Sequence, residues 1–367
     1  MGLAPATKKA EESSRLDRNW SCFNRGFVVI LGESSSITTC SGTPNYAGSP
    51  EHTMKKNSLL AALALAAVLS PAFGEDAGKK LRIVFCPPNM KHSWNVAAAR
   101  AAETDAKKLD IEIIVQDGQG NSPKQSSDLR NAVNQGVDGI VLGANDIHAL
   151  VPAVNDVIAS GIPIVTFDRY VEGTTKKVPF FGLDNVAGGA LLAKYVIDKF
   201  PNGAKILFLT GQPGSSPAID RAKGVHDTLK AAGDKYQIVA EQTGNWMRDQ
   251  GLTITQNMLT SLGSAPDAII ASNDDMALGV LEALQQAGIP KNKVIVLGCD
   301  CTPEALAKIR DGALDGSVEF PLKQVTMAID AIVGHIRENK PVEGKLLDPV
   351  LIEKTNLTAA ERYAELK

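Results

Sequence analysis

The chain has 367 residues, which is enough for two domains or one large domain. Hydrophobic residues make up 44% of it and charged residues 22%, as in soluble globular proteins that bury a core. The net charge of −3 at pH 7 gives no basic surface of the kind that binds nucleic acid or anionic membranes.

The N-terminal part differs in composition from everything that follows. Residues 1–53 are rich in Ser, Thr and Gly and lack sustained periodicity, so we interpret them as a disordered upstream extension that is not native to the protein. At Met54, two lysines precede the apolar run 59–69, and small residues follow at the cleavage positions. This pattern predicts an export signal over 54–74 and a mature start near Glu75. The run is too short for an ordinary transmembrane helix, and an internal buried helix is the weaker alternative.

From Lys80 onward, short apolar runs alternate with amphipathic stretches. The first strand candidates are Arg82–Cys86, Glu112–Gln116, Gly139–Leu142, Pro163–Phe167 and Phe180–Leu183. The helices between them are predicted over Trp94–Lys108, Pro123–Gln135 and His148–Ser160. Ser122 is the predicted N-cap of the second helix, with Pro123 at its first helical position. This order is typical of a parallel sheet covered by helices on both faces.

The alternation then begins a second series of similar size. Its strand candidates are Lys205–Thr210, Gln237–Glu241, Ala268–Ser272, Val294–Gly298 and Ser317–Phe320. Its helix candidates are Ala187–Lys199, Ala218–Ala232, Gln250–Leu262, Asp275–Ala287 and Glu304–Asp311, followed by a long helix Gln324–Arg337 and a last strand Val350–Ile352. We therefore predict two doubly wound α/β lobes with parallel sheets. Their expected boundaries are 80–183 plus 320–347 for the first lobe and 184–319 plus 348–357 for the second.

The stretch 267–279 shows how a strand of this kind ends in polar side chains. Its apolar run Ala268–Ala271 suits a strand buried on both faces. Asn273 and the two aspartates after it can cap the next helix, which Gly288 closes. Such residues lie at the carboxyl edge of a parallel sheet, where open α/β sheets bind ligands. Helix capping alone is the competing interpretation.

Similar polar and aromatic residues follow several other strands. Arginine and carboxylate groups can each hold two adjacent hydroxyl groups, and an indole ring can stack on the apolar face of a sugar. Because buried charged groups are costly unless they are paired or bound to a ligand, the set as a whole indicates a sugar site, although any single member could be a cap or an internal salt bridge. The candidate ligand-binding residues are His92, Trp94, Asn95, Asp168, Arg169, Arg221, Trp246, Asn273, Asp300 and Glu319.

Other chemistries have weaker support. The sequence contains no HExxH, no GxSxG and no P-loop lysine, and 211–216 is a poor phosphate cradle without one. Asp300 and Glu319 could serve as the acid and base of a glycosidase, but no water-activating partner is evident. Cys299 and Cys301 flank Asp300, and buried thiols are favoured there over a strained disulfide or a metal pair. We expect no cofactor, no metal and no catalytic residue.

From Lys80 to about Ile352 the sequence resembles the type I periplasmic sugar-binding proteins of ABC importers, the ribose- and galactose-binding class. The motifs that carry the resemblance are PIVTFDR at 163–169, DNVAGG at 184–189, SNDDMALG at 272–279 and GCDCTP at 298–303. The stretch 218–221, taken with 317–319, is most similar to the galactofuranose-binding branch. Ile219, Glu319 and Gly143 depart from the ribose pattern and weigh against ribose itself.

The resemblance implies two lobes joined by three hinge crossings near Leu183, Phe320 and Asp348, which close on a sugar. Because the candidate site sets three carboxyl groups against two arginines, we expect a neutral monosaccharide or polyol. The resemblance further implies that Asp168, Arg169, Asn273 and Asp300 bind sugar hydroxyl groups and that Trp94 and Trp246 stack on the ring. The expected setting is the periplasm. The expected partners are a small sugar and the permease subunits of an ABC importer, with a chemoreceptor as a further candidate, no nucleic acid, and a monomeric state. A periplasmic carbohydrate enzyme and a LacI-like regulator core are the alternatives, and the regulator would need an N-terminal helix-turn-helix, which the extension does not show.

Overall fold

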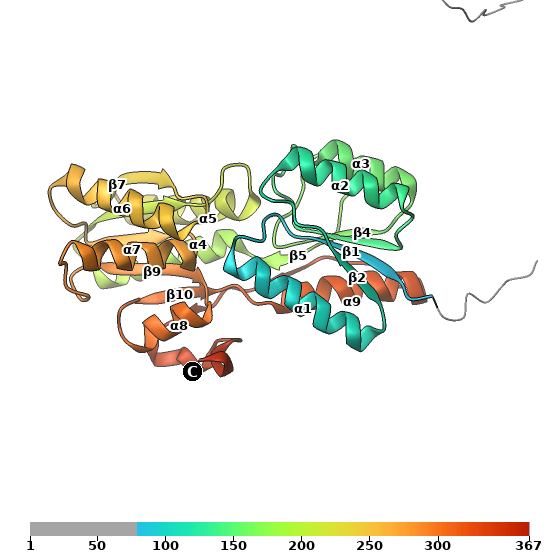
Figure 1. The fold of residues 1–367 in the computed structure, drawn as a ribbon. Helices are drawn as coiled ribbons and strands as arrows, with labels where there is room; N and C mark the ends of the chain where they lie inside the picture. Colours follow the sequence, from blue (N-terminus) through green and yellow to red (C-terminus); the bar gives the residue numbers. More distant parts are fainter. Residues whose placement is uncertain (1–78, 367) are drawn as a thin grey trace, which may run out of the picture. The chain divides into compact units, whose positions relative to one another are not determined.

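The computed structural model describes residues 79–366 (Figure 1). The predicted upstream extension, 1–53, and the predicted export signal, 54–74, lie outside these residues. Within 79–366, no helix combines the length and the apolar composition needed to cross a bilayer.

The first lobe is built on a six-stranded parallel sheet. Its strand order is β11-β5-β4-β3-β1-β2. The strands are β1 (Arg82–Cys86), β2 (Glu112–Val115), β3 (Gly139–Leu142), β4 (Ile164–Phe167), β5 (Phe180–Leu183) and β11 (Lys345–Leu347). The helices are α1 (Ser93–Leu109), α2 (Ser122–Asn134), α3 (Val151–Ser160) and α9 (Lys323–Glu338). Helix α1 packs beside α9, and α2 packs beside α3 (Figure 1).

The second lobe contains a six-stranded sheet of order β12-β10-β9-β8-β6-β7, parallel except for the last edge strand, which runs antiparallel to β10. Its strands are β6 (Ala204–Thr210), β7 (Tyr236–Thr243), β8 (Ala268–Ala271), β9 (Ile295–Asp300), β10 (Gly316–Glu319) and β12 (Leu351–Ile352). Its helices are α4 (Asn185–Lys199), α5 (Ser216–Ala232), α6 (Arg248–Leu262), α7 (Asp274–Gln286) and α8 (Pro303–Arg310), followed by 3₁₀ turns η1 (Lys354–Ala359) and η2 (Tyr363–Glu365).

The central strands β1, β3, β4, β6, β8 and β9 are buried on both faces, which explains why they are largely continuous apolar runs. In β6, Ile206 and Phe208 pack toward α4 and α5, whereas Leu207 and Leu209 pack toward α6 and α7. Successive side chains of a strand point to opposite faces, so one strand supplies two separate apolar layers. The predicted fold, two doubly wound α/β lobes, is confirmed.

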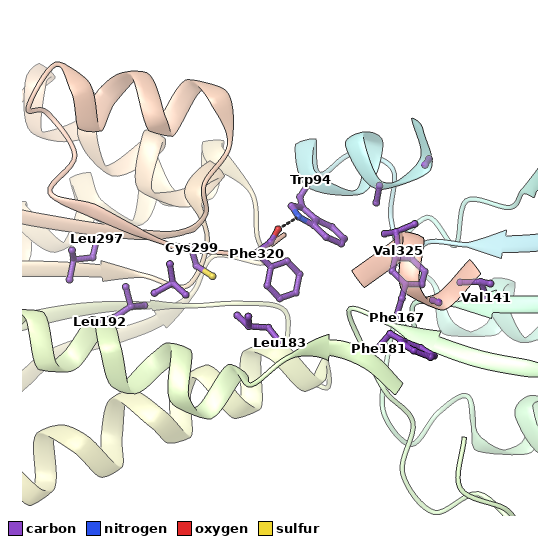
Figure 2. Close-up of a cluster of buried hydrophobic side chains, with 14 of the residues drawn as sticks. Trp94, Val141, Phe167, Phe181, Leu183, Leu192, Leu297, Cys299, Phe320 and Val325 are labelled. Atoms are coloured by element: carbon purple, nitrogen blue, oxygen red, sulfur yellow. Dashed lines mark hydrogen bonds between the residues drawn. The ribbon is translucent and has the colours of Figure 1, made fainter. Parts of the chain in front are cut away.

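The chain crosses between the lobes three times, after β5, after β10 and after β11. The crossings are tied together by backbone hydrogen bonds from Asp184 N to Leu347 O (3.1 Å) and from Glu319 N to Val350 O (2.8 Å). An apolar cluster continues through this hinge, with Phe320 and Leu183 between the two sheets (Figure 2). The predicted three-stranded hinge is therefore present.

Three local details differ from the sequence-based expectation. The N-cap of α2 is Asn121 and not Ser122, because the Asn121 side-chain oxygen accepts a hydrogen bond from Lys124 N (2.8 Å). Helix α3 begins at Val151, since residues 148–150 form a turn. Strand β11 had no sequence signal, because it is a short and mostly exposed edge strand.

Candidate functional site

A cavity lies between the lobes at the carboxyl ends of the strands. It is lined by His92, Trp94, Asn95, Asp168 and Arg169 of the first lobe, by Pro217, Arg221, Trp246, Asn273 and Asp300 of the second, and by Phe320 of the hinge. The structure thus brings together every predicted site residue except Glu319. Pro217 and Phe320 are additional, and neither has a polar side chain that could have marked it in the sequence.

The cavity is small. It offers about 40 Å³ to the centres of water molecules. If the radius of a sphere of that volume is increased by about 1.4 Å, the radius of a water molecule, its volume becomes roughly 180 Å³. About six water molecules occupy this volume in the liquid. That space suits one ring-shaped molecule with its hydroxyl groups.

Asp168 and Arg169 stand at the end of β4 and form the charged part of the first-lobe wall. Arg169 Nε lies 3.4 Å from Asp168 Oδ2, and both side chains are buried. Asp168 adopts a left-handed backbone conformation with φ of 57°, which aspartate tolerates better than most residues. Burial raises the pKa of Asp168, although the charges of Arg169 and Arg221 act in the opposite direction.

His92 and Asn95 flank the first turn of α1 on the same wall. Asn95 donates a hydrogen bond from Nδ2 to Asn89 O (2.8 Å), which fixes its side chain. Burial, followed by the charge of Arg169, lowers the pKa of His92 to about 4. The imidazole is therefore neutral at pH 7 and has one donor and one acceptor nitrogen.

Arg221 is the cation of the second-lobe wall and is held rigidly. Its Nε donates to Asn185 Oδ1 (2.8 Å) and its Nη1 donates to Ser272 O (2.6 Å). The guanidinium also lies 4.8 Å from the ring centre of Phe320 and 5.6 Å from that of Trp246. These contacts stabilise a buried charge and leave its remaining N–H groups at the cavity wall.

Asn273 and Asp300 complete the second-lobe wall. Asn273 caps α7 by accepting from Met276 N (3.1 Å) and donates to Trp246 O (3.2 Å), so the capping interpretation and the site interpretation both hold for it. Asp300 ends β9 with φ of 130° and is buried. Burial and the neighbouring Asp274 carboxyl raise its pKa well above the ordinary value.

The two indole rings of the site differ in how their N–H groups are used. Trp94 Nε1 donates to Phe320 O (2.7 Å), and its ring packs at 58° on the Phe320 ring with 4.9 Å between centres (Figure 2). Trp246 Nε1 is buried and has no hydrogen-bond partner within residues 79–366. Trp94 is therefore bonded to the hinge, whereas Trp246, also a residue of the cavity wall, has an unused donor.

Further polar groups of the cavity residues also lack partners. His92 Nδ1 and Arg169 Nε are buried without a hydrogen bond within the described part of the chain, although Arg169 Nε lies 3.4 Å from its ion-pair partner Asp168 Oδ2. No protein donor within residues 79–366 bonds the carboxyl group of Asp300. A buried polar group without a partner costs free energy, so such groups are expected where a ligand binds. The site offers donors and acceptors together, and a hydroxyl group can satisfy both.

Glu319 does not line the cavity. It is the last residue of β10, and its carboxylate accepts a hydrogen bond from Glu361 N (3.3 Å), in the C-terminal segment. Burial raises the pKa of Glu319 to about 7. The sequence placed this residue at the correct sheet edge but had no signal for the return of residues 353–366 beside it.

The cysteines near the site are buried free thiols, as favoured from the sequence. Cys301 Sγ lies 3.3 Å from Ser317 O. Beside them, Asp274 is fully buried and accepts hydrogen bonds from Ser317 Oγ (2.7 Å) and Thr302 N (2.8 Å). Burial raises the pKa of Asp274 to about 6. This carboxyl group joins β10 and α8 to α7 and so supports the position of Asp300.

Comparison with known proteins identifies relatives of this architecture. Residues 83–340 match the periplasmic binding protein domain. The ribose import binding protein of Bacillus subtilis is 34% identical over 73% of this chain and 87% of its own length. The crystal structure of a Caulobacter myo-inositol binding protein bound to myo-inositol is 42% identical, with a TM-score of 0.77 over 79% of this chain and 98% of that one. A Bacillus halodurans ABC transporter solute binding protein with bound myo-inositol is 28% identical, with a TM-score of 0.73 over 78% and 98% of the two chains. The chain belongs to the periplasmic binding protein family.

Proposed function

We propose that this protein captures one neutral ring compound rich in hydroxyl groups, a monosaccharide or a cyclitol, and delivers it to an ABC importer. The observation that carries the proposal is the interlobe cavity, where unpartnered donors and acceptors from both lobes converge beside two indole rings. Closing the hinge around a ligand would pair these groups and remove them from water.

Seven of the wall residues receive a role in this proposal. Asp168 and Asp300 accept hydrogen bonds from ligand hydroxyl groups, and Arg169 and Arg221 donate to hydroxyl oxygens. The Trp246 ring covers an apolar face of the ligand. Phe320 and Trp94, bonded to each other at the hinge, form the floor against which the ring rests.

Among neutral ligands we favour a six-membered carbocycle of the inositol type. The 42% identity to the Caulobacter protein bound to myo-inositol supports this choice, as does the second myo-inositol complex among the similar structures. The cavity volume agrees with a single six-membered ring. Ile219, at a position where the ribose pattern has arginine, is 44% exposed and does not line the cavity, so it does not decide between ribose and other ligands.

A negatively charged ligand fits this site poorly. Asp168 and Asp300 line the same cavity as Arg169 and Arg221, so the site holds one carboxyl group for each guanidinium group. A sugar acid or a sugar phosphate would add a like charge beside these carboxyl groups, at a cost on the order of 1 kcal/mol or more for each contact.

The family supports the cellular setting that we propose. Relatives such as the ribose import binding proteins act in import, which supports a binding role rather than catalysis and permease subunits as partners. We further propose that the protein is exported by the signal over 54–74, works as a monomer in the periplasm, and offers a chemoreceptor a second binding surface.

The test is a binding screen on protein that has been unfolded and refolded to remove any ligand acquired during expression. Calorimetric titrations with myo-inositol, ribose, galactose, glucuronate and ribose 5-phosphate should show saturable binding of a neutral compound, with myo-inositol the tightest. Binding of glucuronate or the phosphate without binding of any neutral compound would overturn the proposal. Tight binding of ribose or galactose without myo-inositol would overturn only the choice of cyclitol.

A further inference from the structure

Helix α1 begins at the cleft without a cap from its own lobe. Its N-cap residue is His92, which makes no side-chain capping hydrogen bond. The first N–H groups of a helix have no partner within the helix, and this end carries a partial positive charge. The amide group of Ser93, the first helical residue, therefore needs an acceptor from elsewhere.

The acceptor comes from the opposite lobe. The carboxylate of Asp275 accepts hydrogen bonds from Ser93 N (3.3 Å) and from Ser93 Oγ (3.0 Å). Asp275 is itself in the first turn of α7, so its carboxylate stands between the N-terminal ends of two helices that belong to different lobes. A carboxylate is favoured at each of these ends. Neither Asp275 nor Ser93 lines the cavity, so their contact uses no group of the cavity wall.

We propose that Asp275 is a positioning residue that holds the lobes closed by capping α1 across the cleft. Ser93 and Asp275 are 182 positions apart in the chain and belong to separate sheets, so a hinge opening that separates the lobes must break this cap. When the cap forms, it stabilises the closed form and slows escape of the ligand. It leaves the contacts between ligand and cavity wall unchanged.

A second carboxylate makes the same kind of contact beside the hinge. The N-cap of α9, Leu322, also lacks a side-chain capping bond. Glu361, whose segment packs on the second lobe, accepts from Leu322 N (2.5 Å) and Lys323 N (3.0 Å). Because this contact adjoins the crossing 319–322, a hinge rotation displaces it little. The second lobe thus caps both α1 and α9, and only the Asp275 cap lies across the opening cleft.

The experiment compares ligand dissociation from wild type, Asp275→Ala and Asp198→Ala by stopped-flow displacement. The probe is myo-inositol, or the screened neutral compound that the wild type binds, so this arm rests on the proposed function. Asp198→Ala is the matched control, because it removes the same group from an exposed pair with Lys194 (2.9 Å) near the end of α4. Asp275→Ala should raise the dissociation rate about two- to thirtyfold, the range expected for loss of one helix cap, and leave the association rate nearly unchanged. The control should match the wild type.

Amide hydrogen exchange of Ser93 in the ligand-free protein provides a readout that does not depend on the ligand. Exchange should be faster in Asp275→Ala than in the wild type and unchanged in Asp198→Ala. Equal dissociation rates in Asp275→Ala and the wild type, or equal Ser93 exchange, would overturn the proposed role of Asp275. Failure of the wild type to bind any neutral compound would instead refute the proposed function, and the exchange measurement alone would then test the role of Asp275.

Discussion

Gly211, just after β6, lies against the ring of Trp246, and a single methyl group there should perturb the site. A Cβ atom built at Gly211 would stand 2.0 Å from Cη2 and Cζ2 of Trp246 and 2.4 Å from Cε2. Carbon atoms normally approach to about 3.5–4.0 Å, so in Gly211→Ala the ring must retreat by roughly 1.5–2 Å. The guanidinium groups of Arg169 and Arg221, 5.7 and 5.6 Å from the ring centre, limit where it can go.

The displaced indole cannot move without changing a cavity that leaves only about 40 Å³ to water centres. Overpacking of this kind costs about 1–3 kcal/mol of packing free energy. Because the ligand needs the ring at the place that the added methyl group blocks, this cost should appear in binding, and ligand affinity should fall about five- to 150-fold. The assay is calorimetric titration of the folded variant with the ligand found by the screen.

The control is Gly139→Ala in β3, where a Cβ would lie 2.9–3.1 Å from the Cδ1 atoms of Ile332, Ile83 and Ile336. That change crowds the first-lobe core away from the cavity, so it should lower thermal stability and keep wild-type affinity. Wild-type affinity in folded Gly211→Ala would refute the placement of the Trp246 ring at the ligand.

Three further predictions concern other parts of the chain. Trp94 and Trp246 are the only tryptophans of the predicted mature protein, so intrinsic fluorescence should change saturably with the ligand. Trp246→Ala should weaken ligand binding by about 1–3 kcal/mol, and unchanged affinity would contradict the stacking role of its ring. Burial raises the pKa of Glu319 from 4.5 to about 7, so the stabilising effect of its neutral form is complete below pH 4.5 and is lost as the pH rises through 7. Thermal melts should therefore show Glu319→Gln stabilised at pH 8, by up to about 3 kcal/mol, and equal to wild type near pH 4.5; a constant difference would disprove this. N-terminal sequencing of secreted protein should find a start near Glu75, and recovery of residues 1–53 in it would rule out the predicted processing.

The sequence predicted well which residues lie at the carboxyl edge of each sheet, because in a parallel sheet the residues that follow every strand lie at the same edge. Asp168 and Asp300 could be assigned to one site from that rule alone. The sequence could not show that Trp94 bonds to Phe320, 226 positions away, or that Asp275 reaches α1. Both depend on how the two lobes meet. The sequence placed Glu319 among the candidate site residues for a similar reason. The C-terminal segment that packs beside it has no hydrophobic periodicity from which its position could be predicted.

The measurement that tests the central claim most directly is a calorimetric titration of Asp300→Asn against the wild type with the neutral ligand. This substitution keeps the size of the side chain and breaks no hydrogen bond that the protein makes within residues 79–366. If the buried carboxylate binds ligand hydroxyl groups, affinity should fall by about 1.5–3 kcal/mol, or ten- to 150-fold, while the melting temperature of the ligand-free protein stays the same or rises. Undiminished affinity in the folded variant would contradict a sugar site in the interlobe cavity.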